Sequence, residues 1–149
     1  GYHYGIRHAG MIANYAYKHA GFFRGEDSSL KVANTAMILD CLYFNEEAGN
    51  HIDVLTHPGD KGPFDIEDIA KACADTGTLI EINDKHAHLT VEEIKIAAKF
   101  DVSFIIGSDA HVPEKVGSFE GPLRRALEAG LDPGRIVNIS LANEGQKEI

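Results

Sequence analysis

Imidazole and carboxylate side chains stand at the ends of three short apolar runs. His8 ends the first run, His57 follows the second, and Asp109 and His111 follow the third. Imidazole and carboxylate ligands together suit Zn, Mn or Fe. Such ions clamp phosphoryl oxygens and lower the pKa of a bound water. These residue types therefore indicate a hydrolytic metal centre.

The spacing of these residues supports this interpretation. Asp109 and His111 are two positions apart, so in an extended segment both side chains point the same way. Gly59 and Gly107 permit tight turns next to the ligands. Each residue also has an ordinary structural role, as a polar cap on a strand end or, for Asp109, in an Asx-turn. The coincidence of three imidazoles and one carboxylate favours metal binding.

Further polar residues lie close to these motifs. Glu81 lies within an apolar run and serves either an ion pair or the site. His86 and His88 follow that run, where an ordinary loop is favoured over contact with substrate or metal.

Three basic residues are candidates to bind a phosphate oxygen, with plain surface charge as the alternative. They are Arg7, Lys61 and Lys85.

The elements that must position these residues are alternating strands and helices. Short apolar runs alternate with amphipathic patterns, which predicts an α/β fold of βα units in a parallel sheet or barrel. Strands are expected at residues 2–8, 52–56, 78–82, 102–106 and 135–139. The carboxyl ends of parallel strands share one rim, so the candidate ligands should meet there.

Local signals place the helices between these strands. Helical spacing from Leu30 to Phe44 follows a serine cap at position 28 or 29 and stops at Gly49. A second helix is expected between Asp65 and Gly77. Thr90 and Glu93 form a capping box for a third. Apolar residues at positions 119, 123, 126 and 127 predict a fourth.

Composition limits the possible partners. The formal net charge is −9 and no Lys/Arg cluster interrupts it, so a broad nucleic-acid surface is not expected. An anionic small substrate would need a bound cation to reverse the local charge. Neither a membrane-spanning run nor a signal peptide is visible, and we expect a cytoplasmic protein with Cys41 and Cys73 as reduced, buried thiols.

The motifs, in order, resemble the later motifs of PHP (polymerase and histidinol phosphatase) proteins. The resemblance covers nearly the whole chain and rests on Gly5-Ile6-Arg7-His8, Thr56-His57-Pro58-Gly59, Leu79-Ile80-Glu81-Ile82-Asn83, Gly107-Ser108-Asp109-Ala110-His111 and Arg135-Ile136-Val137-Asn138. It implies a distorted (β/α)7 barrel of which residues 1–149 are the C-terminal portion.

The same resemblance implies a metal-dependent phosphoesterase, with up to three divalent ions and a phosphorylated small molecule as substrate. His8 and His57 would share one metal, Asp109 would bind a second and His111 a third, with Asp109 and His111 in the catalytic centre. Glu81 and Asn83 match a family motif near the site, without an implied ligand role.

One departure from the family pattern is the absence, before His8, of its early His-x-His pair, two further histidines and bridging glutamate. We therefore expect weak metal binding and little catalysis from this chain alone, and a homodimer through the open barrel edge at strand 2–8. Two alternatives stay open. One is a non-catalytic PHP-like structural or partner-binding module, and the other is an amidohydrolase-type metallohydrolase.

Overall fold

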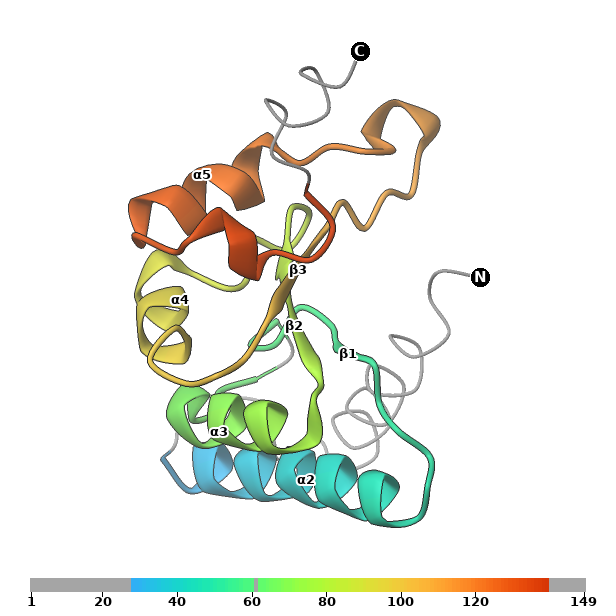
Figure 1. The fold of residues 1–149 in the computed structure, drawn as a ribbon, viewed down its shortest axis with the longest axis vertical. Coiled ribbons are helices and arrows are strands. Elements are labelled where there is room, and N and C mark those ends of the chain that lie inside the picture. The colour runs from blue at the N-terminus through green and yellow to red at the C-terminus, as the bar shows by residue number, and fades with distance from the viewer. Residues whose placement is uncertain (1–27, 61, 140–149) are drawn as a thin grey trace.

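The computed structural model describes residues 28–60 and 62–139, which form an α/β unit (Figure 1). Its sheet has the order β1-β2-β3, with all neighbours parallel. The strands are β1 (Val54–Leu55), β2 (Leu79–Asn83) and β3 (Phe104–Gly107). Three of the expected strands are thereby confirmed in place and order. The strand expected at 2–8 lies outside the described residues, so dimerisation through it stays a prediction.

The helices begin and end where the local signals predict. Helix α2 (Ser28–Glu47) ends just before Gly49, which has a φ of 79°. In α3 (Ile66–Thr76) the Asp65 side chain accepts two backbone N–H bonds, and Gly77 closes the helix in the left-handed conformation. The capping box of Thr90 and Glu93 opens α4 (Val91–Ala97). Figure 1 shows α3 between α2 and α4, on the same side of the sheet.

Helix α5 (Glu120–Glu128) forms as expected but presents a different face to the core. Phe119 and Leu127 remain 46% and 54% exposed, whereas Ala126 is fully buried. Of the apolar residues that predict this helix, Ala126 faces the core and Leu127 does not, and Phe119 is the N-cap. In this orientation α5 buries Pro122 and Ala126, and the Arg125 guanidinium donates to backbone carbonyls in the β2–α4 connection.

The segment 135–139 does not form the predicted strand. A 3-10 turn (Pro133–Arg135) precedes it, and pairing with the sheet is limited to one parallel bridge between Ile136 and Phe104. Instead, the Asn138 side chain accepts from the N–H of Ile106 at 2.9 Å and donates to its carbonyl at 2.7 Å. An amide side chain thus takes the place of a strand backbone.

The core lies between the sheet and the helices. Ile69, Ile80 and Phe104 are fully buried. Cys73 is also fully buried and reduced, as expected, and burial raises its pKa to about 12. Cys41 is only partly buried. Among the described helices, none is both long and apolar enough to cross a membrane.

Replacing Asn138 by Ala should destabilise the fold, because Ile106 would lose partners for both backbone groups. Each buried polar group left unsatisfied costs roughly 1–3 kcal/mol. Urea unfolding should therefore show a loss of at least about 2 kcal/mol for Asn138→Ala, since two groups are affected. Val137→Ala, at a neighbouring side chain that is 54% exposed, should stay within about 0.5 kcal/mol of the parent. Equal stability of both variants would contradict the role given to Asn138.

Candidate metal centre

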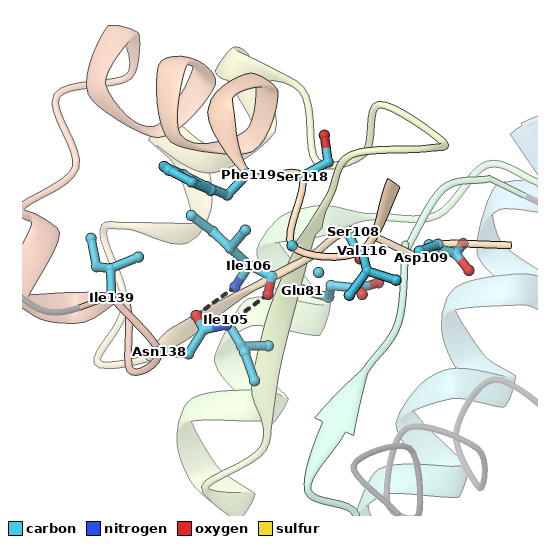
Figure 2. A pocket seen from close by; sticks show the side chains of 13 residues that line it. Glu81, Ile105, Ile106, Ser108, Asp109, Val116, Ser118, Phe119, Asn138 and Ile139 are labelled. Carbon is cyan, nitrogen blue, oxygen red and sulfur yellow. Dashed lines mark hydrogen bonds between the residues drawn. The ribbon is translucent and has the colours of Figure 1, made fainter. Parts of the chain in front are cut away.

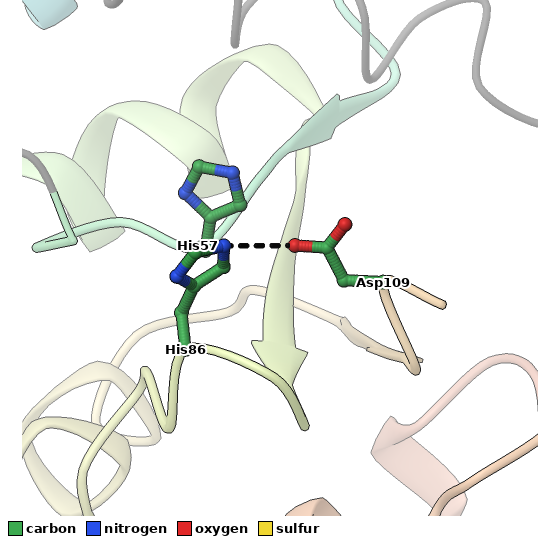
Figure 3. A group of neighbouring side chains, drawn as sticks. All are labelled: His57, His86 and Asp109. Carbon is green, nitrogen blue, oxygen red and sulfur yellow. Dashed lines mark ion pairs between the residues drawn. The ribbon is translucent and has the colours of Figure 1, made fainter. Parts of the chain in front are cut away.

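Three side chains from three strand ends converge in the described part of the chain: His57, His86 and Asp109 (Figure 3). One ligand atom from each lies within 4.8 Å of the others. Nε2 of His86 lies 3.1 Å from Oδ2 of Asp109, and the two imidazole rings are 4.7 Å apart between centroids. His57 follows β1, His86 follows β2 and Asp109 follows β3, as the shared rim of a parallel sheet requires.

The backbone at two of these residues has an unusual conformation. His57 has a φ of 24° and Asp109 a φ of 51°. Positive φ is uncommon for residues other than glycine and carries a conformational cost. Such strain persists where the surroundings enforce it, and it concentrates at functional sites.

Two buried residues of β2 hold this geometry in place. Oε2 of Glu81 accepts the N–H of His57 at 2.7 Å and the Asn83 side-chain amide at 3.0 Å. The same amide nitrogen lies 3.4 Å from Oδ2 of Asp109, and the Asn83 oxygen accepts the N–H of His86 at 2.8 Å. Asn83 therefore connects Glu81 with two members of the cluster, and Glu81 holds the third.

Gly107 makes room for the Glu81 carboxylate. A Cβ atom at position 107 would lie 2.0 Å from Oε1 of Glu81. Gly107 pairs with Asn83 in the sheet register, so glycine is needed where β3 passes the buried side chains of β2.

A second carboxylate adds negative charge on the other side of His86. Nδ1 of His86 lies 2.9 Å from Oδ1 of Asp60, while Nδ1 of His57 lies 4.0 Å from Oδ2. His86 thus stands between the carboxylates of Asp60 and Asp109. A cluster of this charge attracts a cation.

The donor set fits a divalent transition metal. Imidazole nitrogen and carboxylate oxygen bind such ions at about 2.0–2.2 Å, so ligand atoms on one ion lie roughly 3–4 Å apart. The separation of 3.1 Å between Nε2 of His86 and Oδ2 of Asp109 falls in this range, while the 4.8 Å limit of the whole cluster lies above it, so the three side chains would draw together around one ion. Two nitrogens and one oxygen suit Zn, Mn or Fe.

The other predicted site residues have different positions. His111 is outside the cluster and its side chain is 63% exposed. Its Nδ1 lies 2.7 Å from the Asp109 carbonyl oxygen and 3.1 Å from Nζ of Lys85. His8, Arg7 and Lys61 lie outside the described residues. The structure therefore brings two of the four predicted ligands, His57 and Asp109, into one cluster, and His86 is the third member.

The sequence alone favours an ordinary loop for His86 and gives no signal that distinguishes Asp60. The available signal was position, because His86 comes three residues after the end of β2, at the rim that carries the other ligands. Residues in a loop follow no regular repeat, so the sequence does not predict which way the His86 side chain points.

The loop that carries His86 is fixed at both ends by α5. The Arg125 guanidinium donates to the carbonyl oxygen of Asn83, where the loop begins, and to that of Leu89, where it ends. Burial lowers the pKa of Arg125, and the nearby carboxylates of Asp84 and Glu93 oppose this effect. One side chain of α5 thereby contacts both ends of the loop that carries His86.

Known proteins resemble this chain in sequence. The PHP-associated family matches residues 92–119. A probable phosphatase of Syntrophotalea carbinolica is 32% identical over 135 residues, which cover 82% of this chain and 53% of that protein. A probable phosphatase of Shewanella halifaxensis is 31% identical over 75% of this chain and 47% of its own length. One from Proteus mirabilis is 34% identical, with coverages of 66% and 46%.

The parallel sheet with polar side chains at its strand ends defines the class of protein. It is an α/β protein whose candidate site lies at the carboxyl ends of the strands. Together with the motifs and these relatives, it identifies the chain as a member of the PHP-domain family, corresponding to a C-terminal portion of such a domain. The chain spans about half the length of the curated relatives it matches.

Gly107→Ala should disrupt the site and destabilise the protein. The new methyl group would collide with the Glu81 carboxylate, which would have to leave its bonds with His57 and Asn83. We expect a loss of roughly 2 kcal/mol or more in unfolding free energy, since a buried charge would lose its partners. The matched control is Gly134→Ala, where a Cβ would meet nothing closer than 3.4 Å. Similar stability of the two variants would show that Glu81 is free to move.

Arg125→Met should loosen the loop that carries His86. Two carbonyl groups would lose a charged donor, which costs roughly 1–3 kcal/mol. Thermal unfolding measures the change. Arg124→Met, at the exposed neighbouring position on α5, removes the same charge without the contact and should have little effect. If both substitutions lower stability equally, net charge rather than the loop contact is responsible.

Proposed function

We propose that this chain is part of a metal-dependent phosphatase, in which His57, His86 and Asp109 bind a divalent ion. The observation that carries the proposal is the convergence of these three side chains within 4.8 Å. The relatives in Syntrophotalea carbinolica and Shewanella halifaxensis are named probable phosphatases. Their names favour phosphoester hydrolysis over the amidohydrolase alternative.

The negative charge around the cluster explains why a phosphate would need a bound cation. The cluster contains the Asp109 carboxylate, those of Asp60 and Glu81 lie beside it, and the chain has a net charge of −9. A phosphate dianion would be repelled from this surface. A bound divalent ion would neutralise phosphoryl oxygens and activate a water.

The chain's own residues would orient and hold the centre. Asn83 and Glu81 fix His57, His86 and Asp109 through hydrogen bonds, so the ligands need little reorganisation on binding. Lys85 and His111 lie together next to Asp109, exposed to solvent, where they could contact a phosphate oxygen. We assign His111 to substrate or a further metal, with Lys85 beside it.

We further propose that the sheet is part of a distorted (β/α)7 barrel, completed in the full-length protein by strands outside the described residues. His8 would join the site from such a strand. The parallel order β1-β2-β3 with ligands at a common rim supports this arrangement. The substrate would be a phosphorylated small molecule.

Metal content tests the proposal directly. The full-length protein should retain Mn or Zn after desalting, measured as metal per chain by mass spectrometry. His57→Ala combined with Asp109→Ala should reduce the metal retained at this site at least tenfold, because two of the three ligands in the described part of the chain are lost. His86→Ala alone should also weaken it. His51→Ala is the control, since His51 is exposed and pairs with Glu46.

Activity is measured on the same preparations with a panel of phosphate monoesters. Chelation should abolish hydrolysis and added metal should restore it. Retention of full activity after the metal has been removed would refute metal dependence. Normal metal content in the double variant would refute the assigned ligands.

A further inference from the structure

A cleft of about 720 Å³ opens beside Asp109 at the carboxyl end of β3 (Figure 2). Its walls come from Glu81 of β2, from β3 and the residues that follow it, from the segment before α5 and from the segment after the last 3-10 turn. Asp109 lies at one end of the cleft and Ile139 toward the other, with Phe119 above them in this view. The cleft therefore begins at a proposed metal ligand and extends away from it.

Apolar side chains dominate the walls of this cleft. They include Ile105, Ile106, Val116, Phe119 and Ile139. Val116 is 75% exposed and Phe119 is 46% exposed. Single exposed apolar residues are ordinary, but a group of them around one concavity indicates a binding surface.

The charge of the cleft excludes several kinds of ligand. Its ionisable lining consists of Glu81 and Asp109, and none of the described residues that line it is Lys or Arg. A ligand with further phosphate or carboxylate groups would be repelled along the cleft. Alkyl or aryl groups would instead displace water from apolar walls, and the volume suits a small molecule.

We propose that this cleft binds the apolar alcohol portion of a phosphomonoester whose phosphate lies at the metal centre. This inference rests on the proposed phosphatase function, because Asp109 belongs to both the cluster and the cleft. The substrate class is therefore alkyl or aryl phosphates. Val116 and Phe119 are the specificity-determining residues.

A homologous series of substrates tests the assignment. The full-length protein, loaded with Mn, is assayed with ethyl, butyl and hexyl phosphate, whose leaving alcohols have similar acidity. Each methylene buried in the cleft should raise kcat/KM by up to about fourfold, so hexyl phosphate should exceed ethyl phosphate by at least about tenfold. Val116→Ser combined with Phe119→Ser should bring this ratio toward one.

Two controls keep the test specific. Val32→Ser, at a side chain that is 71% exposed on α2, should keep the parent ratio. If the double variant does not fold, Val116→Ser alone replaces it, since this position is mostly exposed, and it should also lower the ratio of kcat/KM between hexyl and ethyl phosphate. Calorimetric binding of ethylphosphonate and hexylphosphonate gives a second readout that does not need turnover.

The outcomes separate this inference from the proposed function. Hydrolysis with the same kcat/KM for all chain lengths would overturn the cleft assignment and leave the phosphatase intact. Chain-length-dependent phosphonate binding without hydrolysis would support the cleft and overturn the phosphatase. If neither phosphonate binds, the cleft assignment is overturned. It is also overturned if Val116→Ser lowers the stability of the protein and neither binding nor hydrolysis depends on chain length, because the protein's own residues would then fill the cleft.

Discussion

The buried carboxylate of Glu81 is the constraint on which the site depends. A carboxylate that is 5% exposed within a sheet must be hydrogen-bonded, because an unsatisfied buried charge is far too costly. Its donors are the His57 N–H and the Asn83 side chain, and its space exists because β3 has a glycine at position 107. These requirements fix the three strand ends relative to each other. The candidate ligands follow from that placement.

Helix α5 also helps to position the residues at this rim of the sheet. Arg125 of α5 holds both ends of the loop that bears His86, and Asn83 fixes the N–H of His86 itself. The positive φ angles of His57 and Asp109 occur beside the same buried pair, since Glu81 accepts the N–H of His57 and the Asn83 amide lies against the Asp109 carboxylate. These contacts hold the candidate ligands in place, which would lower the reorganisation that metal binding requires.

In the proposed function, the charged cluster and the apolar cleft would recognise different parts of the substrate. Under the proposed function, this acidic chain would need a cation to attract a phosphate group, and the cluster of His57, His86 and Asp109 has the donor chemistry for one. The neighbouring cleft offers apolar walls instead of charges. In this arrangement the metal centre would recognise what phosphomonoesters share, and the cleft would distinguish their alcohols.

The sequence by itself determined the order of strands and helices, the caps at Asp65 and Thr90, and the rim positions of His57 and Asp109. These features depend on periodicity and on contacts within a few residues, which local sequence encodes. Only the tertiary structure decided that His86 joins the cluster, that α5 turns Arg125 inward, and that Asn138 replaces a strand. Each of these depends on a side chain meeting a partner 23 or more residues away along the chain, as Arg125 meets Asn83 with a separation of 42. A local sequence pattern does not predict such a contact, because the contact forms only when the sheet and the helices pack together.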